Sequence, residues 1–198
     1  MREAATRSLD QSLVNWLEQR MVGRLLMKHQ MVGKSLLDVP CGYGRFWQTF
    51  THLGLQLVGI DRDPAMTRKA AGNLHGDGSH PPVCGNIFTL PFEDETFDCV
   101  FCIRLLHLQF TDGERRSILR ELARVSRRLV LISIYQPTPL HGLWRRVHGT
   151  PGRLRFTTAA QLTELLGQSE LSLLELRPLQ RGLHMQTFVL LSKADRGR

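Results

Sequence analysis

Two glycines directly after a short apolar run are the first residues of this sequence that could hold a ligand. Residues 36–39 are apolar apart from Asp38, and residues 40–46 then read Pro-Cys-Gly-Tyr-Gly-Arg-Phe. Gly42 and Gly44 carry no Cβ, so the backbone can take left-handed dihedrals there and a ligand can approach it closely. A buried strand, a glycine-rich turn and a helix in this order are typical of α/β sheets that bind nucleotides beyond the carboxyl end of the strand.

A carboxylate at the end of the next apolar run supplies a second candidate group. Residues 55–60 read as a strand, and Asp61 follows them, about 20 residues beyond the glycine turn, where such folds place the acid that holds the ribose hydroxyls. A carboxylate can accept both hydroxyl hydrogen bonds. The pyrophosphate-binding pattern G-x-G-x-x-G is incomplete, because Trp47 stands in the place of its third glycine. The motifs favour a nucleoside ligand without a pyrophosphate and leave a nicotinamide-dependent oxidoreductase as a less favoured alternative.

Further along the chain, additional blocks follow these two motifs in a recognisable order. They lie at residues 85–100, at residues 105–108 and at residues 121–125. With the first two, they resemble the class I S-adenosylmethionine-dependent methyltransferases, and most of all the small-molecule branch that is similar to ubiquinone and menaquinone methyltransferases. The resemblance implies an α/β fold, a Rossmann-like seven-stranded and mostly parallel sheet with helices on both faces and an antiparallel C-terminal strand. It also implies S-adenosyl-L-methionine as cofactor.

The same resemblance assigns candidate cofactor-binding residues by position. Asp38 and the glycine turn would face the methionine half of the cofactor, and Asp61 would take the ribose hydroxyls. Asn86 and Ile87 would frame the adenine. Asn86 stands where the family usually has aspartate, but its side-chain carbonyl still offers a hydrogen-bond acceptor. The complete expected set is Asp38, Pro40, Cys41, Gly42, Tyr43, Gly44, Asp61, Arg62, Asn86, Ile87 and Ile103.

The candidate residues for the methyl acceptor follow the fourth predicted strand, 97–103, and occupy a long connection at 135–156. His107 is the candidate catalytic residue, since a histidine with a pKa near neutrality could take a proton from the acceptor; the alternative is that it only packs beneath the sheet edge. Arg104 could hold an anionic substrate or pair with the cofactor carboxylate. Long connections in compact domains are often lids or binding loops, although a disordered basic loop is the other interpretation. The expected substrate-binding residues are Arg104, His107, Tyr135, Trp144 and Arg145.

Residues 8–29 have apolar side chains at helical spacing and predict an N-terminal helix, with Ser8 or Asp10 as its cap. Three basic residues four apart would line one side of this helix. It could act as a lid over the cofactor pocket, or pack on the sheet with a solvated basic stripe. We therefore expect an N-terminal helix within residues 1–30 and a single methyltransferase domain over residues 31–198.

Composition sets the broad class. The chain has 198 residues, 42% hydrophobic residues and no apolar run long enough to span a bilayer, which favours one soluble domain in the cytoplasm. The N-terminus lacks the apolar core of a signal peptide. Four cysteines fit free thiols in a reducing compartment. Cys99 and Cys102 are three apart on a predicted strand, so they would point to opposite faces, and we expect no metal site.

The net charge of +8 raises the local concentration of anionic partners, although it can also serve solubility alone. The expected acceptor is a small molecule or lipid-like compound. The basic surface is compatible with an anionic one. RNA or protein is the less favoured acceptor class. A cofactor-binding protein that acts through a partner without catalysis is the remaining alternative. The sequence does not indicate an oligomeric state.

Overall fold

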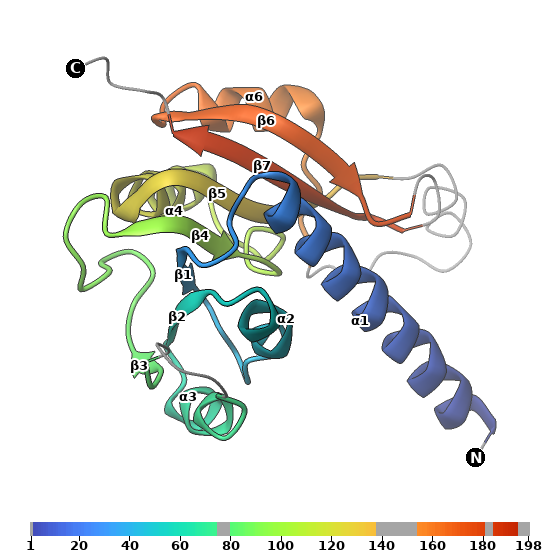
Figure 1. The fold of residues 1–198 in the computed structure, drawn as a ribbon. Helices are drawn as coiled ribbons and strands as arrows, with labels where there is room; N and C mark the ends of the chain where they lie inside the picture. The colour runs from blue at the N-terminus through green and yellow to red at the C-terminus, as the bar shows by residue number, and fades with distance from the viewer. Residues whose placement is uncertain (1, 75–79, 138–153, 181–183, 194–198) are drawn as a thin grey trace.

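The chain folds around one mixed sheet with helices on both faces (Figure 1). The computed structural model describes residues 2–74, 80–137, 154–180 and 184–193, with side chains from residue 12 onward. In chain order the elements are α1 (Arg2–Lys28), β1 (Ser35–Asp38), α2 (Trp47–His52), β2 (Gln56–Asp61), α3 (Pro64–Ala71), β3 (Val83–Cys84), β4 (Phe97–Cys102), α4 (Asp112–Val125), β5 (Ser126–Tyr135), α6 (Ala159–Leu166), β6 (Leu171–Pro178) and β7 (Gln186–Lys193).

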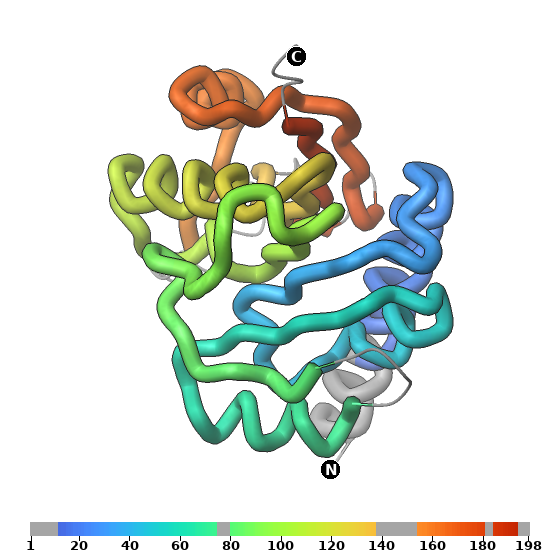
Figure 2. The backbone as a smooth tube through the Cα atoms, turned by 60° about the vertical axis from the view of Figure 1, so that its left-hand side comes forward, coloured from blue at the N-terminus to red at the C-terminus, as the bar shows by residue number. Residues whose placement is uncertain are grey.

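The seven strands lie in the order β3-β2-β1-β4-β5-β7-β6. Strands β1 to β5 pair in parallel, and β7 runs antiparallel to both β5 and β6. Figure 2 shows α3 at the opposite end of the molecule from β6 and β7, as this order requires. In chain order the sheet begins in its middle with β1 and extends to one edge through β2 and β3. It then continues from the other side of β1 with β4. The predicted Rossmann-like sheet is therefore confirmed, and its switch point for ligand binding lies between β1 and β4.

Alternating side chains of each strand supply two hydrophobic cores, one on each face of the sheet. In β4, Val100 and Cys102 pack with leucines of α4 and α6. Cys99 and Phe101 pack on the other face, with apolar residues of α1, α2 and α3. The prediction that Cys99 and Cys102 point to opposite faces is thus confirmed.

Some boundaries differ from the sequence-based expectation. The N-terminal helix begins at Arg2, so Ser8 and Asp10 lie inside it and neither caps it, because the preceding residues include good helix formers. The helix after the glycine turn begins only at Trp47, since the residues before it form turns. No helix among the described residues is both long and apolar enough to cross a membrane.

Candidate functional site

The turn after β1 is fixed to the neighbouring strands by main-chain hydrogen bonds. The amide of Val39 donates to the carbonyl of Phe101 at 2.9 Å, and the amide of Cys41 donates to the carbonyl of Ile60 at 2.8 Å. Gly42 follows with a φ of 54° and Gly44 with a φ of 77°, both in the left-handed region that favours glycine. The turn is therefore held at the carboxyl ends of β1 and β2, where the sequence placed it.

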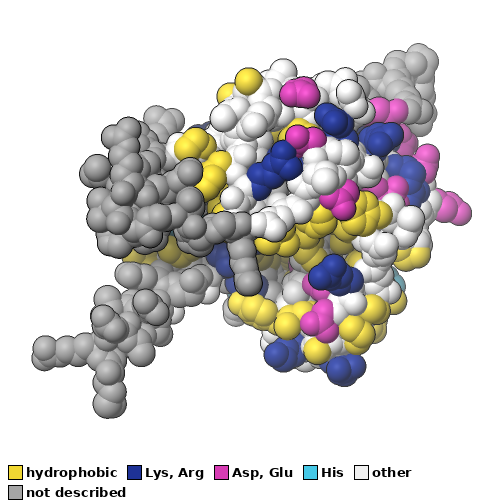
Figure 3. Space-filling model, turned by 180° about the vertical axis from the view of Figure 1, so that it is seen from behind, with side chains coloured by type: hydrophobic (Ala, Val, Ile, Leu, Met, Phe, Trp, Pro, Cys, Tyr) yellow, Lys and Arg dark blue, Asp and Glu magenta, His cyan; other side chains and the backbone are white. Residues whose placement is uncertain are grey.

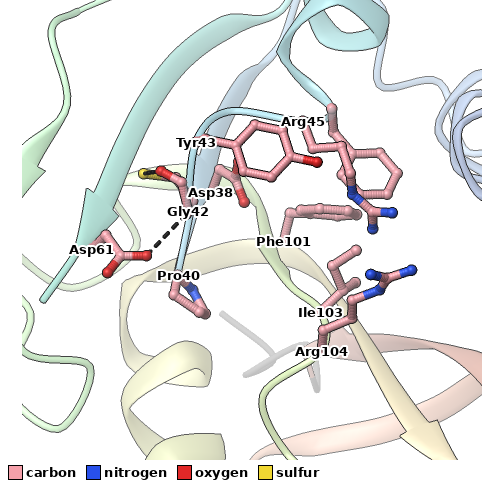
Figure 4. Close-up of a pocket in the computed structure, with 11 residues that line it drawn as sticks. Asp38, Pro40, Gly42, Tyr43, Arg45, Asp61, Phe101, Ile103 and Arg104 are labelled. Atoms are coloured by element: carbon pink, nitrogen blue, oxygen red, sulfur yellow. Dashed lines mark hydrogen bonds between the residues drawn. The ribbon is translucent and has the colours of Figure 1, made fainter. Parts of the chain in front are cut away.

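The carboxylate of Asp61 is held in place by this turn. Its Oδ2 accepts a hydrogen bond from the amide of Gly42 at 2.9 Å (Figure 4). Its Oδ1 accepts one from the amide of Asp63 at 2.9 Å. Each carboxylate oxygen keeps a further lone pair for a ligand. Asp63 also caps α3 by accepting from the amide of Ala65, with Pro64 at the first helical position.

A hollow of about 230 Å³ opens beside the turn. Asp61 lies at one end of it, and the guanidinium groups of Arg45 and Arg104 lie at the other (Figure 4). The two ends present opposite charges, and the wall between them carries aromatic and aliphatic side chains. The full lining is Asp38, Pro40, Cys41, Gly42, Tyr43, Arg45, Phe46, Asp61, Phe101, Ile103 and Arg104.

A second hollow, of about 300 Å³, adjoins the first and shares Pro40, Asp61 and Arg104 with it. Both hollows together reach the size range of about 300–1,000 Å³ that is typical of ligand sites. The second is mostly apolar, and its lining also includes Val39, Ile60, Arg62, Gly85, Asn86, Ile87, Phe88, Leu105, Leu108 and Phe110.

Asn86 lies in the second hollow with its side-chain oxygen already in use. Its Oδ1 accepts a hydrogen bond from the amide of Phe88 at 3.1 Å, which closes a tight turn. An amide oxygen has two lone pairs, so one remains for a ligand donor. The structure therefore brings Asn86, Ile87 and Arg62 to one apolar hollow next to Asp61, as the expected adenine and ribose positions require.

Asp38 is buried behind the glycine turn. The indole N–H of Trp47 donates to its Oδ2 at 2.8 Å. Burial raises the pKa of Asp38 to about 8, against the lowering effect of the Trp47 hydrogen bond, and the nearby Asp61 charge raises it further. The Trp47 ring packs over the α carbons of Gly44 and Gly59, where a Cβ would collide with it. The residue that replaces the third glycine thus fills the space behind the turn.

Glu18 of α1 joins the site, and the sequence reasoning missed it. Its carboxylate is fully buried and accepts hydrogen bonds from Arg104 Nη2 at 2.9 Å and Nε at 3.2 Å, and also from Arg45 Nη1. The long N-terminal helix is therefore tied to both arginines of the first hollow. A signal was present, because Glu18 falls between Val14 and Val22 in the apolar stripe of the helix.

His107 lies near the end of β4 but lines neither hollow. Its ring stacks on Tyr135 at 4.2 Å between centroids and 7° between planes. Burial, together with the charge of Arg104, lowers the pKa of His107 to about 4 rather than leaving it near neutrality as expected. Burial likewise raises the pKa of Tyr135. The imidazole is therefore neutral at pH 7.

The remaining expected residues are placed as follows. Pro40, Cys41, Tyr43 and Ile103 line the first hollow, whereas Gly44 lines neither. Trp144 and Arg145 lie outside the described residues. Within the described part of the chain, no group of three or more His, Cys, Asp or Glu side chains could hold a metal ion. Arg45 and Phe101, which line the first hollow, were not anticipated.

Comparison with known proteins finds similarity over the part of the chain that carries the glycine turn and the two hollows. The family described as "Methyltransferase domain" matches residues 37–132. A ubiquinone biosynthesis O-methyltransferase of Rhodopseudomonas palustris (strain HaA2) is 38% identical over 76 residues, which are 37% of this chain and 29% of the relative. A probable tRNA methyltransferase 9B of Homo sapiens is 29% identical over 102 residues, 52% of this chain and 21% of the relative. The matched region thus spans less than a third of these relatives.

Solved structures extend the likeness to most of the fold. Magnesium protoporphyrin IX methyltransferase (ChlM) from Synechocystis PCC 6803 with bound SAH superposes with a TM-score of 0.76 at 16% sequence identity. The superposition covers 91% of this chain and 84% of that one. At this identity the match concerns the fold alone. Residues 37–132 are therefore similar to a methyltransferase domain, and the sheet as a whole has the fold of solved methyltransferases.

Proposed function

We propose that the protein transfers a methyl group from S-adenosyl-L-methionine to a small-molecule or lipid-like acceptor. The observation that carries the proposal is the pair of joined hollows, with the fixed Asp61 carboxylate where they meet and two arginines at the end of the first. This order of groups complements a nucleoside that carries an amino-acid tail. The apolar second hollow fits a flat base, Asp61 fits the ribose hydroxyls, and Arg45 and Arg104 fit a carboxylate.

The residues of this chain contribute mainly by positioning. When bound, the cofactor supplies an electrophilic methyl group on a positively charged sulfur, which is already a good leaving group. Asp61 and the arginines fix the two ends of the ligand, so the reacting carbon is presented in one direction. Buried aromatic and aliphatic walls, including Phe101 and Ile103, exclude water from the space between them.

His107 is the proposed proton acceptor, although it is a weak base. Its neutral imidazole has a lone pair available, but the lowered pKa makes it a weak base. Attack of the acceptor on a sulfonium methyl carbon can proceed by proximity with little base assistance. We therefore propose that His107 holds the acceptor's hydroxyl or amine by a hydrogen bond and takes up its proton only as the new bond forms.

A small acceptor is favoured over RNA or protein. On the face shown in Figure 3, Lys and Arg side chains are interspersed with Asp and Glu and do not form one basic surface. Arg104 lines both hollows, so it can pair with the cofactor carboxylate or with an anionic acceptor. The tRNA methyltransferase relative keeps RNA as the second candidate. We also propose a cytoplasmic location, because all four cysteines are free thiols.

Transfer of labelled methyl from S-adenosylmethionine into a fractionated cell extract tests the proposal. We expect label in the small-molecule or lipid fraction with the wild-type chain and none with Asp61→Ala. Glu164→Ala, on the exposed surface of α6, removes the same charge far from the site and should leave transfer unchanged. Label in the RNA fraction would move the acceptor to nucleic acid. Cofactor binding by calorimetry without label in any fraction would favour a non-catalytic role.

A further inference from the structure

Gln186, the first residue of β7, is fully buried, and neither its amide oxygen nor its amide nitrogen has a hydrogen-bond partner. Buried polar groups without partners are destabilising and rare in native proteins. Among the buried side-chain atoms of the described residues, the others without partners are Nδ1 of His107 and Nε of Arg115. An amide with both functions unpaired therefore indicates a site that a ligand completes.

Gln186 and His107 meet at the same tyrosine. Tyr135 is the cross-strand partner of Gln186 in the pairing of β5 with β7, and directly paired residues have Cβ atoms about 5 Å apart. The ring of Tyr135 stacks on His107. Two of the residues with unpartnered buried polar atoms thus both neighbour Tyr135, at the carboxyl end of β5.

This position lies beside the arginine end of the first hollow. Gln186 shares its sheet face with Phe188 and Leu190, which belong to the core beneath α1. The charges of Arg104 and Glu18 act on the phenol of Tyr135 and on the imidazole of the nearby His184. The Gln186 amide is therefore buried close to the arginine end of the first hollow, where the methionine half of the cofactor would end.

We propose that Gln186 and His107 Nδ1 form the polar wall of the methyl-acceptor site, and that Gln186 binds an acceptor with a hydrogen-bond donor and a hydrogen-bond acceptor on neighbouring atoms. A hydroxyl beside a second oxygen on a ring is such a pair. The side-chain amide offers one carbonyl and one amino group side by side, so it complements this pair with two hydrogen bonds. The inference rests on the proposed methyl transfer.

The reaction balances with these residues. The hydroxyl oxygen attacks the methyl carbon, the carbon–sulfur bond breaks, and its electron pair stays on sulfur, so that S-adenosylhomocysteine is formed. The hydroxyl proton, shared between Gln186 Oε1 and His107 Nδ1 before the transfer, passes to His107 Nδ1 as the new bond forms and is released to water after the product leaves. Gln186 and His107 are both buried in this structure. The incoming acceptor must therefore displace the side chains that cover them, and its own hydrogen bonds replace those packing contacts.

Thermal stability separates a binding role from a structural one. Gln186→Leu removes two unpartnered buried atoms, so the melting temperature should rise by about 2–4 °C. Thr187→Val is the matched control. Thr187 is also buried, but its hydroxyl donates to Oε1 of Gln136 at 2.9 Å, and its loss should lower the melting temperature by a similar amount. A fall in Gln186→Leu like that of the control would overturn the proposal.

Transfer assays complete the test. With labelled S-adenosylmethionine and the extract fraction that the wild type methylates, we expect Gln186→Leu to lose at least about tenfold in transfer, since one or more hydrogen bonds to the acceptor are gone. Its calorimetric affinity for S-adenosylmethionine should stay within about twofold of wild type. Unchanged transfer, or a product methylated on an atom without a polar neighbour, would refute the inference. Failure of the wild type to bind S-adenosylmethionine would refute the methyltransferase function itself.

Discussion

The protonation of Asp38 should make the fold less stable as pH rises. Its pKa is about 8 in the folded chain, and its ordinary value is 3.8. Between these values the unfolded chain has lost this proton and the folded chain keeps it, so the stabilising contribution is complete below about pH 4 and is lost as pH rises towards 8. Each pH unit in this window costs about 1.4 kcal/mol, which is about 2.7 kcal/mol from pH 5 to pH 7.

The assay is urea unfolding of wild type and Asp38→Asn at pH 5, 6 and 7 at constant ionic strength. Asparagine cannot ionise, and its carbonyl can still accept from Trp47, so the variant should lack this part of the pH dependence. The wild-type stability should therefore fall more steeply than that of the variant by about 1.4 kcal/mol per pH unit.

Asp98→Asn is the control for this experiment. Burial pushes the pKa of Asp98 upward, but hydrogen bonds from Ser35 and Arg127 outweigh it and hold that pKa below its usual range. Asp98 is thus ionised in both the folded and the unfolded chain between pH 5 and 7. Its replacement should change the free energy of unfolding by the same amount at each pH and leave the slope of that free energy against pH unchanged. If the free energy of unfolding of Asp38→Asn also runs parallel to that of wild type across this pH range, then Asp38 is ionised in the folded chain and the prediction is wrong.

Three further predictions concern other parts of the fold. Glu18→Gln should reduce stability by about 3 kcal/mol in urea unfolding, since it leaves two arginines without their buried counter-charge; an unchanged midpoint would mean that α1 is not held by this carboxylate. Gly59→Ala should cost about 1–3 kcal/mol by forcing a Cβ into the Trp47 ring, whereas Gly72→Ala, with no such overlap, should be close to neutral. A thiol reagent should modify Cys84 rapidly in the folded chain and the other three cysteines only on unfolding, because only Cys84 is exposed; more than one fast thiol per chain would contradict the packing.

The parts of the site that were predictable are those encoded by neighbouring residues. The turn at Gly42 and the acid after β2 follow from a strand, a glycine pattern and a fixed spacing, and all of these are local. The antiparallel final strand was expected from the resemblance and from the apolar run that begins after Gln186. The exact start of α1 was missed because a helix can continue through Ser8, whose capping ability is used only where a helix begins.

The parts that were not predictable depend on contacts between distant segments. Glu18 meets Arg45 across 27 residues and Arg104 across 86, and neither pairing has a local pattern. The sequence does indicate that Glu18 needs a partner, because a carboxylate in an apolar stripe must be paired when the stripe is buried. It could not have identified the two arginine partners, since that depends on how α1 packs against the segments that follow β1 and β4.

His107 shows why residue type alone does not decide chemistry. An isolated histidine has a pKa of 6.5, which suits a general base, and its place after β4 made that role attractive. Burial against Tyr135 and the charge of Arg104 lower that pKa to about 4, so the imidazole at pH 7 is a neutral hydrogen-bonding group with one unpartnered nitrogen. The same burial that weakens it as a base keeps that nitrogen from water. Its value to a methyltransferase therefore lies in orienting a hydroxyl or amine, which is what a reaction driven by proximity requires.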